Sequence, residues 1–550
     1  MSSVESEISE SKGNGLTKTQ CVITIAVAFF GWFFGGTHMA TNGLAMRTAG
    51  KELLTNVGIH DLTAQDASQG EEYYASLNTD GVSGISQDEL ENPAKTSGLS
   101  AKDLTSLKKR LAKKRADQKL LAVDPAQEAA AEEAPAEEAA AEEAPAEEAE
   151  HMEAIATEPI LLTEADLGDW EKERRFNGEV GKWAGFFVVA FLFGAALGGL
   201  VFGYIGDRFG RSRGMTLAII CYSTASLIAY FAQTPEQMWV IRFVVCMGVG
   251  GMWPNGVALI SEAWPTASRP LLAGVLGTAA NVGIFLTFTL GRYVKVTDDD
   301  WRWVMLLGGC PIVLGILSWL LVPESPLWLK KKAEGTVPED PQVKQVSTKD
   351  VFTGKLLPIT ILGILLATVP LLGGWGSANW AVFWADQVGE EMNLPELKAN
   401  VGMARSLTGI FGSFLGGWVA SQFGRRRSYL VTSLICLASA QLLFWYLNPS
   451  QQFLFLLTFG ILGFFSGIFF GWLPLFLPEL FETRIRSTGA GVCFNFGRVI
   501  TALTVVGGAD VLAAFNEDYA LVGRITSWIY LLGAIGICLL PTGVGGEIKE

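Results

Sequence analysis

The chain has 550 residues, of which 50% are hydrophobic, 11% are aromatic and only 17% are charged. This composition is typical of a polytopic membrane protein and excludes an ordinary soluble domain. The formal net charge of −14 comes from one segment, because residues 48–180 hold 30 Asp and Glu against 13 Lys and Arg. The rest of the chain is therefore faintly basic, and we expect no nucleic-acid partner.

Apolar runs of about 20 residues predict membrane-spanning helices. The first run is too long for the core of a signal peptide, so we expect it to remain as the first helix, within 21–47. The sequence predicts an all-α membrane protein with twelve transmembrane helices, at 21–46, 182–205, 214–233, 237–262, 271–292, 303–322, 356–385, 400–422, 429–447, 452–477, 488–509 and 520–541.

The distribution of Lys and Arg in the short loops predicts the orientation. Basic residues such as Arg211 and Arg426 fall on one side of the predicted membrane, and acidic residues such as Asp299 and Glu391 fall on the other. We therefore expect a multi-pass, monomeric protein of the plasma (inner) membrane. Both terminal tails, 1–20 and 542–550, are predicted to be cytoplasmic, and the insertion 48–180 between helices 1 and 2 extracytoplasmic.

A charged, glycine-containing turn occurs twice, at 203–213 and 417–427. A second repeat follows each turn, because Glu262 and Arg269 recur as Glu479 and Arg486. The duplication predicts a six-helix unit used twice, with helices 2–6 in 181–322, a cytoplasmic linker at 323–355 and helices 7–12 in 356–541. Such a duplication suits a transporter with a site near the midplane. Candidate gating residues are Gly203, Asp207, Arg208, Gly210, Arg211, Arg242, Glu262, Arg269, Gly424, Arg425, Glu479 and Arg486.

These motifs carry a family resemblance. The two turns, together with Arg242 before a glycine cluster at 248–251, resemble motifs of the major facilitator superfamily. Residues 323–329 and 301–303 resemble the sugar-porter branch and its organic-acid and sialate symporter relatives. The resemblance implies two pseudo-symmetric six-helix bundles that transport by alternating access without ATP, and a transporter rather than an enzyme, with no catalytic residues.

Arg498 is the leading candidate for substrate binding. It lies near the middle of helix 11, where intramembrane charge is costly, and its counterpart in the first half is Ile284. A guanidinium group suits a carboxylate or a phosphate, so we hypothesise that Arg498 binds an anionic substrate group. An internal contact that holds helix 11 is the alternative. Arg242 and Arg405 lie nearer the predicted outward ends, which favours gating or structural roles.

His38 stands in helix 1 near the place where proton-coupled relatives often have an acid. A histidine can titrate near neutral pH and relay a proton, or it can be a packing residue. Proton coupling and uniport therefore both remain open.

Polar and aromatic side chains complete the predicted substrate site. Trp375, Asn379 and Trp380 lie on helix 7, where indole rings can stack on a sugar. Asn281 and Asn495 are candidate partners of hydroxyl or carboxylate groups, or contacts between helices. We expect a secondary active or facilitative transporter of a small polar metabolite, with an organic or sugar acid favoured over a neutral sugar. A transporter-derived sensor that uses the insertion is the alternative.

The insertion contains a loop, 78–89, that resembles a calcium loop of the EF-hand family. Asn78, Asp80, Ser86 and Glu89 match oxygen-donor positions, but Val82 supplies no side-chain oxygen. A degenerate turn is favoured over a calcium site, and no other cofactor is expected. Residues 128–150 form an acidic Ala/Glu/Pro spacer, and Leu104, Leu107 and Leu111 mark an amphipathic helix that lies on lipid or packs within a small helical domain.

Overall fold

A computed structural model describes residues 16–59, 64–78, 84–92, 96, 101–121, 161–263, 269–333, 351–354, 356–481, 486–514 and 518–540. The chain divides into two compact units. The first unit, called the helical bundle below, comprises Met1–Val57 and Gly178–Glu550, and the second comprises Gly58–Asn177.

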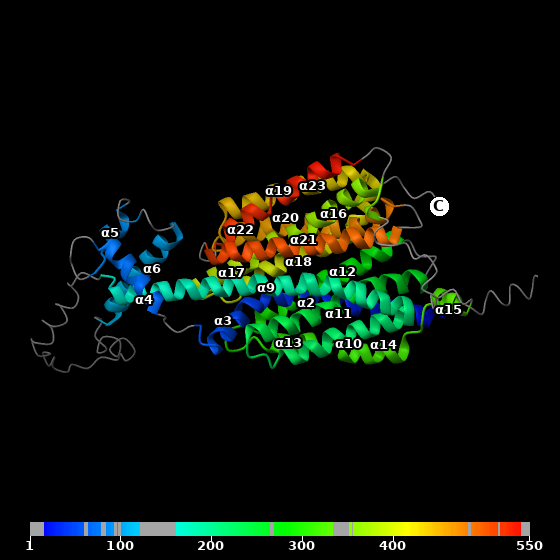
Figure 1. Cartoon of the computed structure of the whole chain (residues 1–550), viewed down its shortest axis with the longest axis horizontal. Helices are drawn as coiled ribbons and strands as arrows, with labels where there is room; N and C mark the ends of the chain where they lie inside the picture. Colours follow the sequence, from blue (N-terminus) through cyan, green and yellow to red (C-terminus); the bar gives the residue numbers. More distant parts are fainter. Residues whose placement is uncertain are drawn as a thin grey trace, which may run out of the picture. The chain divides into compact units, whose positions relative to one another are not determined.

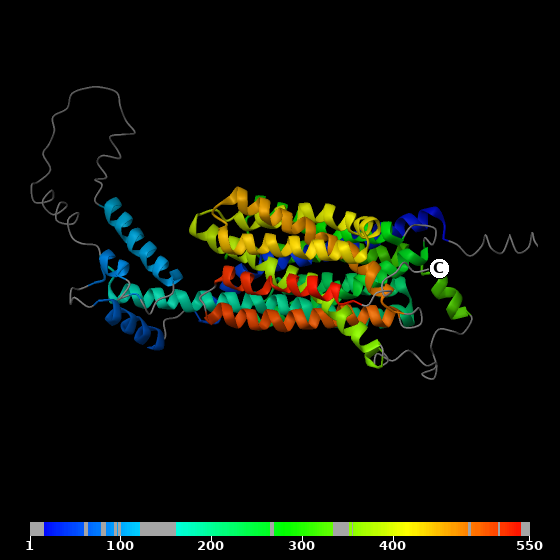
Figure 2. The same ribbon diagram turned by 90° about the horizontal axis from the view of Figure 1, so that it is seen from above.

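The helical bundle is built from long helices that run side by side (Figures 1 and 2). Its first half contains α2 (Lys18–Leu44), α3 (Met46–Asn56), α9 (Glu164–Phe209), α10 (Arg211–Ala229), α11 (Pro235–Ala263), α12 (Arg269–Tyr293), α13 (Trp303–Gly309), α14 (Ile312–Leu321) and α15 (Pro326–Ala333). Its second half contains α16 (Leu356–Gly373), the π-helical turn η2 (Gly374–Ala378), α17 (Asn379–Glu391), α18 (Leu397–Phe423), α19 (Arg425–Tyr446), α20 (Gln452–Glu479), α21 (Arg486–Ala514), α22 (Tyr519–Thr526) and α23 (Ile529–Cys538).

Each apolar run of the sequence coincides with one of these helices or with a pair of them. Within the described part of the chain, ten helical spans are long and apolar enough to cross a membrane, and α10 and α18 are not among them. The number twelve therefore remains a prediction. Two predicted spans are broken, since Cys310 and Pro311 separate α13 from α14, and Ser527 and Trp528 separate α22 from α23.

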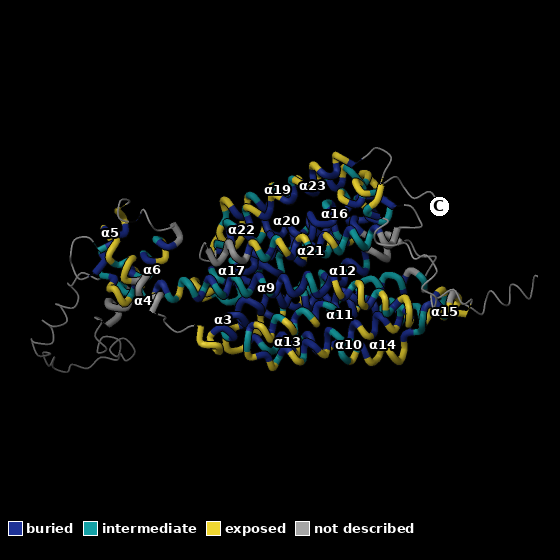
Figure 3. The backbone as a smooth tube through the Cα atoms, in the orientation of Figure 1, coloured by how far each residue is buried: buried dark blue, intermediate teal, exposed yellow. Residues whose placement is uncertain are grey.

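The outer surface of the bundle carries large apolar side chains. Phe231 is 72% exposed, Leu320 71% and Phe453 76%. Exposed residues mark the outer faces of the helices, while buried residues fill the space between them (Figure 3). A surface of this kind is costly in water but suits contact with lipid.

Both charged turns are tight connections that depend on glycine. Gly210 precedes α10 with a φ of 120°, and Gly424 precedes α19 with a φ of 83°. An L side chain rarely adopts these backbone angles, so glycine is required at the same place in both halves.

The second unit has a small core of its own. It contains α4 (Ala64–Leu77), α5 (Gln87–Glu91), α6 (Ala101–Leu121) and the first part of α9. Leu107 and Leu111 are buried in this core and Leu104 packs against it, so the predicted amphipathic helix contacts protein. Residues Ile85 and Leu162 join two segments through backbone hydrogen bonds of 2.8 and 3.0 Å. The acidic spacer 128–150 lies outside the described residues.

Candidate functional site

A cavity of about 800 Å³ lies between the two halves of the helical bundle. Aromatic and small side chains form most of its wall. Among the described residues, Arg405 and Arg498 are the only charged ones that line it. Polar and aromatic lining residues include Trp32, Phe191, Trp253, Asn281, Phe288, Trp375, Asn379, Ser406, Phe494, Asn495 and Phe496.

The cavity extends toward the end of the bundle that carries the charged turns. Its lining includes Trp253 in the last third of α11, Leu477 at the end of α20 and Ala490 near the start of α21. Leu477 lies two residues before Glu479, which pairs with the second charged turn.

Arg498 lies on α21 and reaches across to the first half. Its Nη1 donates to the carbonyl oxygen of Ala195 at 3.0 Å and to Oδ1 of Asn495 at 3.4 Å. The guanidinium group also lies 4.6 Å from the centre of the Phe494 ring. No carboxylate among the described residues pairs with it. The structure thus places the predicted anion-binding residue in the cavity with donor groups still free.

Arg405 lies on α18 and also lines the cavity. The sequence placed it nearer an outward end and favoured a gating or structural role, and the structure adds that it lines the cavity. Its guanidinium group lies 6.0 Å from the centre of the Phe459 ring, and it has neither a carboxylate nor a hydrogen-bond partner within the described part of the chain. Arg405 lies only eight residues after α18 begins. The cavity therefore reaches close to that end of the bundle, which the sequence did not predict.

The predicted helix 7 corresponds to α16, η2 and α17, and only some of its predicted site residues line the cavity. Trp375 and Asn379 line it, and Trp375 packs against Phe191 of the first half in a tilted arrangement, with ring centres 4.3 Å apart. Trp380 is not a lining residue, since it is buried against Tyr519 and donates to the carbonyl oxygen of Gly376. The π-helical turn η2 explains the difference because it changes the residue spacing that an α-helix would give.

The amide nitrogen of Asn379 is a further free donor in the cavity. The residue is only 5% exposed, and Nδ2 has no hydrogen-bond partner among the described residues. Asn281, in contrast, donates to Ser413 Oγ at 2.8 Å and so joins α12 to α18 across the two halves. Asn495 accepts a hydrogen bond from Arg498, as described above.

His38 and Arg242 lie together, away from the lining of the cavity. His38 is fully buried with its ring edge-on to Tyr222, at 5.0 Å between ring centres. Arg242 donates to the carbonyl oxygen of His38 at 3.0 Å and to Oδ1 of Asn42 at 3.2 Å. Arg242 therefore contacts α2 through neutral acceptors. His38 is not among the described residues that line the cavity.

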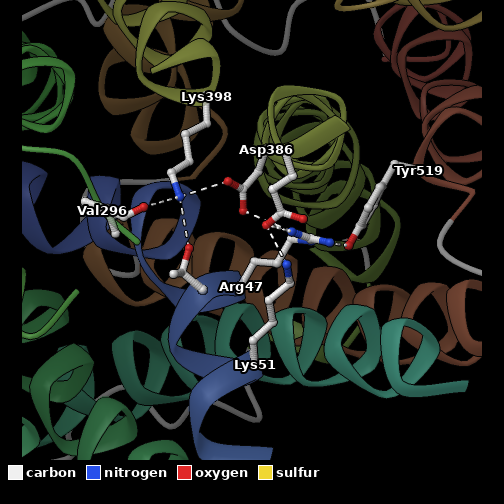
Figure 4. A network of polar contacts seen from close by, with 8 residues as sticks. Arg47, Lys51, Val296, Asp386, Lys398 and Tyr519 are labelled. Carbon is white, nitrogen blue, oxygen red and sulfur yellow. Dashed lines mark hydrogen bonds and ion pairs between the residues drawn. The ribbon is translucent and has the colours of Figure 1, made fainter. Parts of the chain in front are cut away.

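The structure also contains a buried charge cluster that the sequence did not predict (Figure 4). Arg47 of α3 contacts Asp386 at 3.3 Å and Glu390 at 2.9 Å, both on α17. Its Nε donates to the hydroxyl oxygen of Tyr519 at 3.3 Å, and Lys51 pairs with Glu390 at 2.6 Å. Arg47 is 2% exposed and Asp386 5%.

Lys398 of α18 completes the cluster. Its Nζ lies 2.8 Å from Asp386 Oδ1, and it donates to Thr48 Oγ1 at 2.9 Å and to the carbonyl oxygen of Val296 at 3.1 Å. Thr48 and Val296 belong to the first half and Lys398 to the second. The charge cluster, defined as Arg47, Lys51, Asp386, Glu390 and Lys398, therefore connects the two halves. An acid within the apolar run 356–391 was the signal that could have identified it.

Comparison with known proteins agrees with this arrangement of two halves around a cavity. The model of the Major Facilitator Superfamily matches residues 176–505. The chain belongs to the Major Facilitator Superfamily. It is therefore a multi-pass membrane transporter rather than an enzyme.

Individual superfamily relatives cover most of the helical bundle. The cis,cis-muconate transport protein of Acinetobacter baylyi is 28% identical over 57% of this chain and 74% of its own. The major myo-inositol transporter of Bacillus subtilis is 25% identical over 63% and 79%. The crystal structure of a D-xylose-proton symporter shares the fold, with a TM-score of 0.51 at 17% identity over 68% of this chain and 90% of that one.

The charged turns of this superfamily member are held by ion pairs in both halves. In the first turn Asp207 contacts Arg211 at 2.6 Å, and Arg211 lies 3.9 Å from Glu262. In the second turn Arg425 contacts Glu479 at 3.0 Å. The repeated Glu262 and Glu479 therefore have equivalent partners.

Further contacts fix the first turn and the linker that follows α14. Trp328 donates through Nε1 to the carbonyl oxygen of Asp207 at 2.8 Å, and Glu324 accepts from the backbone of Ser212 at 3.0 Å. Arg208 donates to the hydroxyl of Tyr204 at 2.7 Å. The side chains of Arg269 and Arg486, which the sequence also predicted to take part in gating, lie outside the described residues.

The calcium-like loop is only partly described, because Asp80 lies in the undescribed stretch 79–83. Asn78 donates to the hydroxyl of Tyr74 at 2.8 Å. Ser86 and Glu89 form a reciprocal capping box at the start of α5, with Ser86 N donating to Glu89 Oε2 at 3.0 Å. A capping box gives these two residues a structural role, and calcium binding stays a prediction.

Proposed function

We propose that this transporter moves a small organic anion across the membrane by alternating access. The observation that carries the proposal is Arg498, a buried guanidinium group that faces the central cavity without a carboxylate partner in the described part of the chain. Isolated buried charge is costly, and a bound carboxylate would compensate it through charge-assisted hydrogen bonds.

A neutral sugar is the weaker candidate. The relatives include transporters named for an organic acid and for myo-inositol, so family membership leaves both classes open. A neutral polyol would accept hydrogen bonds from Arg498 but would leave its charge uncompensated. The chemistry of the cavity therefore favours the acid.

The two ends of the bundle support alternating access. The cavity extends toward the charged turns, while the charge cluster joins the halves at another place, around Arg47 and Asp386. Breaking these contacts between the halves would let them separate on that side. In the orientation predicted from the loop charges, this arrangement corresponds to an inward-facing state.

Transport by the purified full-length chain in proteoliposomes tests the proposal. We expect uptake of radiolabelled short carboxylic acids and little uptake of neutral polyols. Arg498→Gln should raise the concentration for half-maximal uptake by about 10-fold to 100-fold, the equivalent of a lost charged hydrogen bond. Arg524→Gln is the matched control, since Arg524 donates to the carbonyl oxygen of Phe444 and does not line the cavity.

Two results would decide against the proposal. Uptake of polyols with no uptake of acids would assign the transporter to neutral substrates. Equal uptake by Arg498→Gln and Arg524→Gln would remove the binding role of Arg498. Uptake by the same vesicles under an imposed pH gradient distinguishes proton symport from uniport. This result bears on the hypothesis that His38 relays a proton.

A further inference from the structure

The charge balance of the cavity is unusual for a site that recognises one carboxylate. Arg405 and Arg498 both line it, and no acidic side chain in the described part of the chain does. The cavity therefore carries two formal positive charges in a wall that is otherwise apolar or neutral. A ligand with one negative charge would compensate only half of this charge.

Other buried basic groups in the same bundle are provided with partners. Arg47 has two carboxylates, and Lys398 has one carboxylate and two neutral oxygens. Arg242 has two neutral oxygens, from His38 and Asn42. Nε and Nη1 of Arg242 have no partner among the described residues, but Arg242 does not line the cavity. Arg405 does line the cavity and has no hydrogen-bond partner among the described residues.

The two arginines stand against different parts of the wall. A Cβ added to Gly374 would lie 3.3 Å from Nη2 of Arg405, which places that group beside η2. A Cβ added to Gly199 would lie 3.9 Å from Nη1 of Arg498, which places this group beside α9. Two groups on separate walls suit two separate anionic groups better than one compact phosphate.

The surface available to the body of the ligand is aromatic, and one neutral donor faces it. Phe191 and Trp375 pack against each other in the lining with their rings tilted, and Phe494 lies against Arg498. The free Nδ2 of Asn379, in a side chain that is 95% buried, offers a hydrogen bond to a further oxygen acceptor.

We propose that the substrate is a dicarboxylate with a short, largely apolar body, held by Arg498 at one carboxylate and by Arg405 at the other. This inference rests on the proposed function and goes beyond it, because it adds a second anion-binding residue and a second negative charge. The aromatic wall contacts the body, and Asn379 donates to an oxygen of the ligand.

Ligand-induced thermal stabilisation of the full-length chain in lipid nanodiscs tests the inference. The probes are straight-chain dicarboxylates of four to eight carbons, each against the monocarboxylate of equal length. At least one dicarboxylate should bind about 10-fold or more tightly than its matched monocarboxylate, because it makes one more charged hydrogen-bonded pair. Arg405→Gln should abolish this preference, because it weakens the binding of dicarboxylates more than that of monocarboxylates.

Two further variants keep the test decisive. Arg498→Gln should weaken both classes of acid, and Arg405→Lys should retain part of the preference because it keeps the charge but not the planar fork. If Arg405→Gln fails to fold, the comparison of dicarboxylate with monocarboxylate binding, made on the wild-type chain and on Arg405→Lys, still tests the inference.

Three results would overturn the inference. Equal binding of monocarboxylates and dicarboxylates, with both dependent on Arg498, would leave the proposed function intact and remove the second carboxylate. An unchanged preference in Arg405→Gln would remove Arg405 as its partner. Absence of binding for every acid in both series would refute the proposed function and the inference together.

Discussion

The helical bundle contains arginine side chains in two regions, which differ in whether acidic side chains lie beside them. In the charge cluster, Arg47 contacts Asp386 and Glu390, and Lys398 shares Asp386. In the cavity, Arg405 and Arg498 line a space to which no described acidic residue contributes. Arg47 and Arg498 are buried and Arg405 is half-buried, but among the described residues only the first region supplies the opposite charge.

The difference separates a structural role from a binding role. A buried ion pair that is complete gives no reason to bind an external ion, and removing one partner is strongly destabilising because the other charge stays buried. A buried cation without a partner destabilises the empty protein and gains most from an anionic ligand. Stability measurements on variants of the two regions should therefore differ in size.

The largest effect on stability is expected for Asp386→Asn. The substitution leaves Lys398 without a carboxylate and Arg47 with Glu390 alone, so the free energy of unfolding should fall by about 3–5 kcal/mol. Denaturant unfolding in detergent micelles measures it. Glu390→Gln is the control, because Glu390 is 40% exposed and exposed pairs contribute about 1 kcal/mol or less. Equal losses in the two variants would contradict a buried, structural cluster.

Arg498→Gln should leave the unfolding free energy of the empty protein within about 1 kcal/mol of wild type. It removes hydrogen bonds to Ala195 and Asn495 but also removes an uncompensated charge, and these terms oppose each other. The same denaturant assay measures it. A loss as large as that of Asp386→Asn would make Arg498 a structural residue that holds α21, the alternative that the sequence left open.

Much of the bundle could be predicted from the sequence, because long apolar runs and glycine-containing charged turns are local signals. The bounds of α11 and α12 lie within two residues of the predicted spans. The repeat of Glu262 as Glu479 correctly indicated equivalent ion pairs in the two turns. Arg498 was found in the cavity because charge in the middle of an apolar helix is rarely incidental.

The charge cluster could not be predicted in the same way. Arg47 and Asp386 are 339 residues apart in the chain, and no spacing rule connects them. The place of Arg405 in the cavity lining was not predicted, because distance along a helix does not reveal how far a cavity reaches. Trp380 was assigned to the cavity by α-helical spacing, which the π-helical turn η2 changes.

Lys398→Met sharpens the comparison at the contact between the halves. Methionine keeps the apolar stem but loses bonds to Asp386, Thr48 and Val296, so the unfolding free energy should fall by about 1–3 kcal/mol. Loosened contacts should also expose Thr48, which is 2% exposed in this state. A Thr48→Cys reporter, read with a membrane-impermeant thiol reagent, should label faster in the Lys398→Met background.

Lys51→Met in the same reporter background is the matched control. Lys51 pairs with Glu390 alone among the contacts described above, and Glu390 keeps Arg47 after the substitution. Labelling at the wild-type rate in both backgrounds would show that Lys398 does not hold the halves together.

The smallest effect is expected at Asp298, in the loop beside the charge cluster. Burial raises the pKa of this carboxyl above its ordinary value, and the negative charges of Glu390 and Asp386 add to the rise, against Lys51 and Arg47. Because the folded-state pKa is the higher one, protonated Asp298 stabilises the fold at low pH, and this contribution is lost as pH rises through the folded pKa.

Asp298→Asn cannot ionise, so its melting temperature should match that of wild type below about pH 4 and exceed it increasingly at higher pH. The gain should stay below about 1 kcal/mol, because the side chain remains exposed enough for solvent to screen its charge. Thermal melts across a pH series, with Asp299→Asn as the control on the same loop, measure it. A pH-independent difference would show that the pKa of Asp298 is not raised in the folded state.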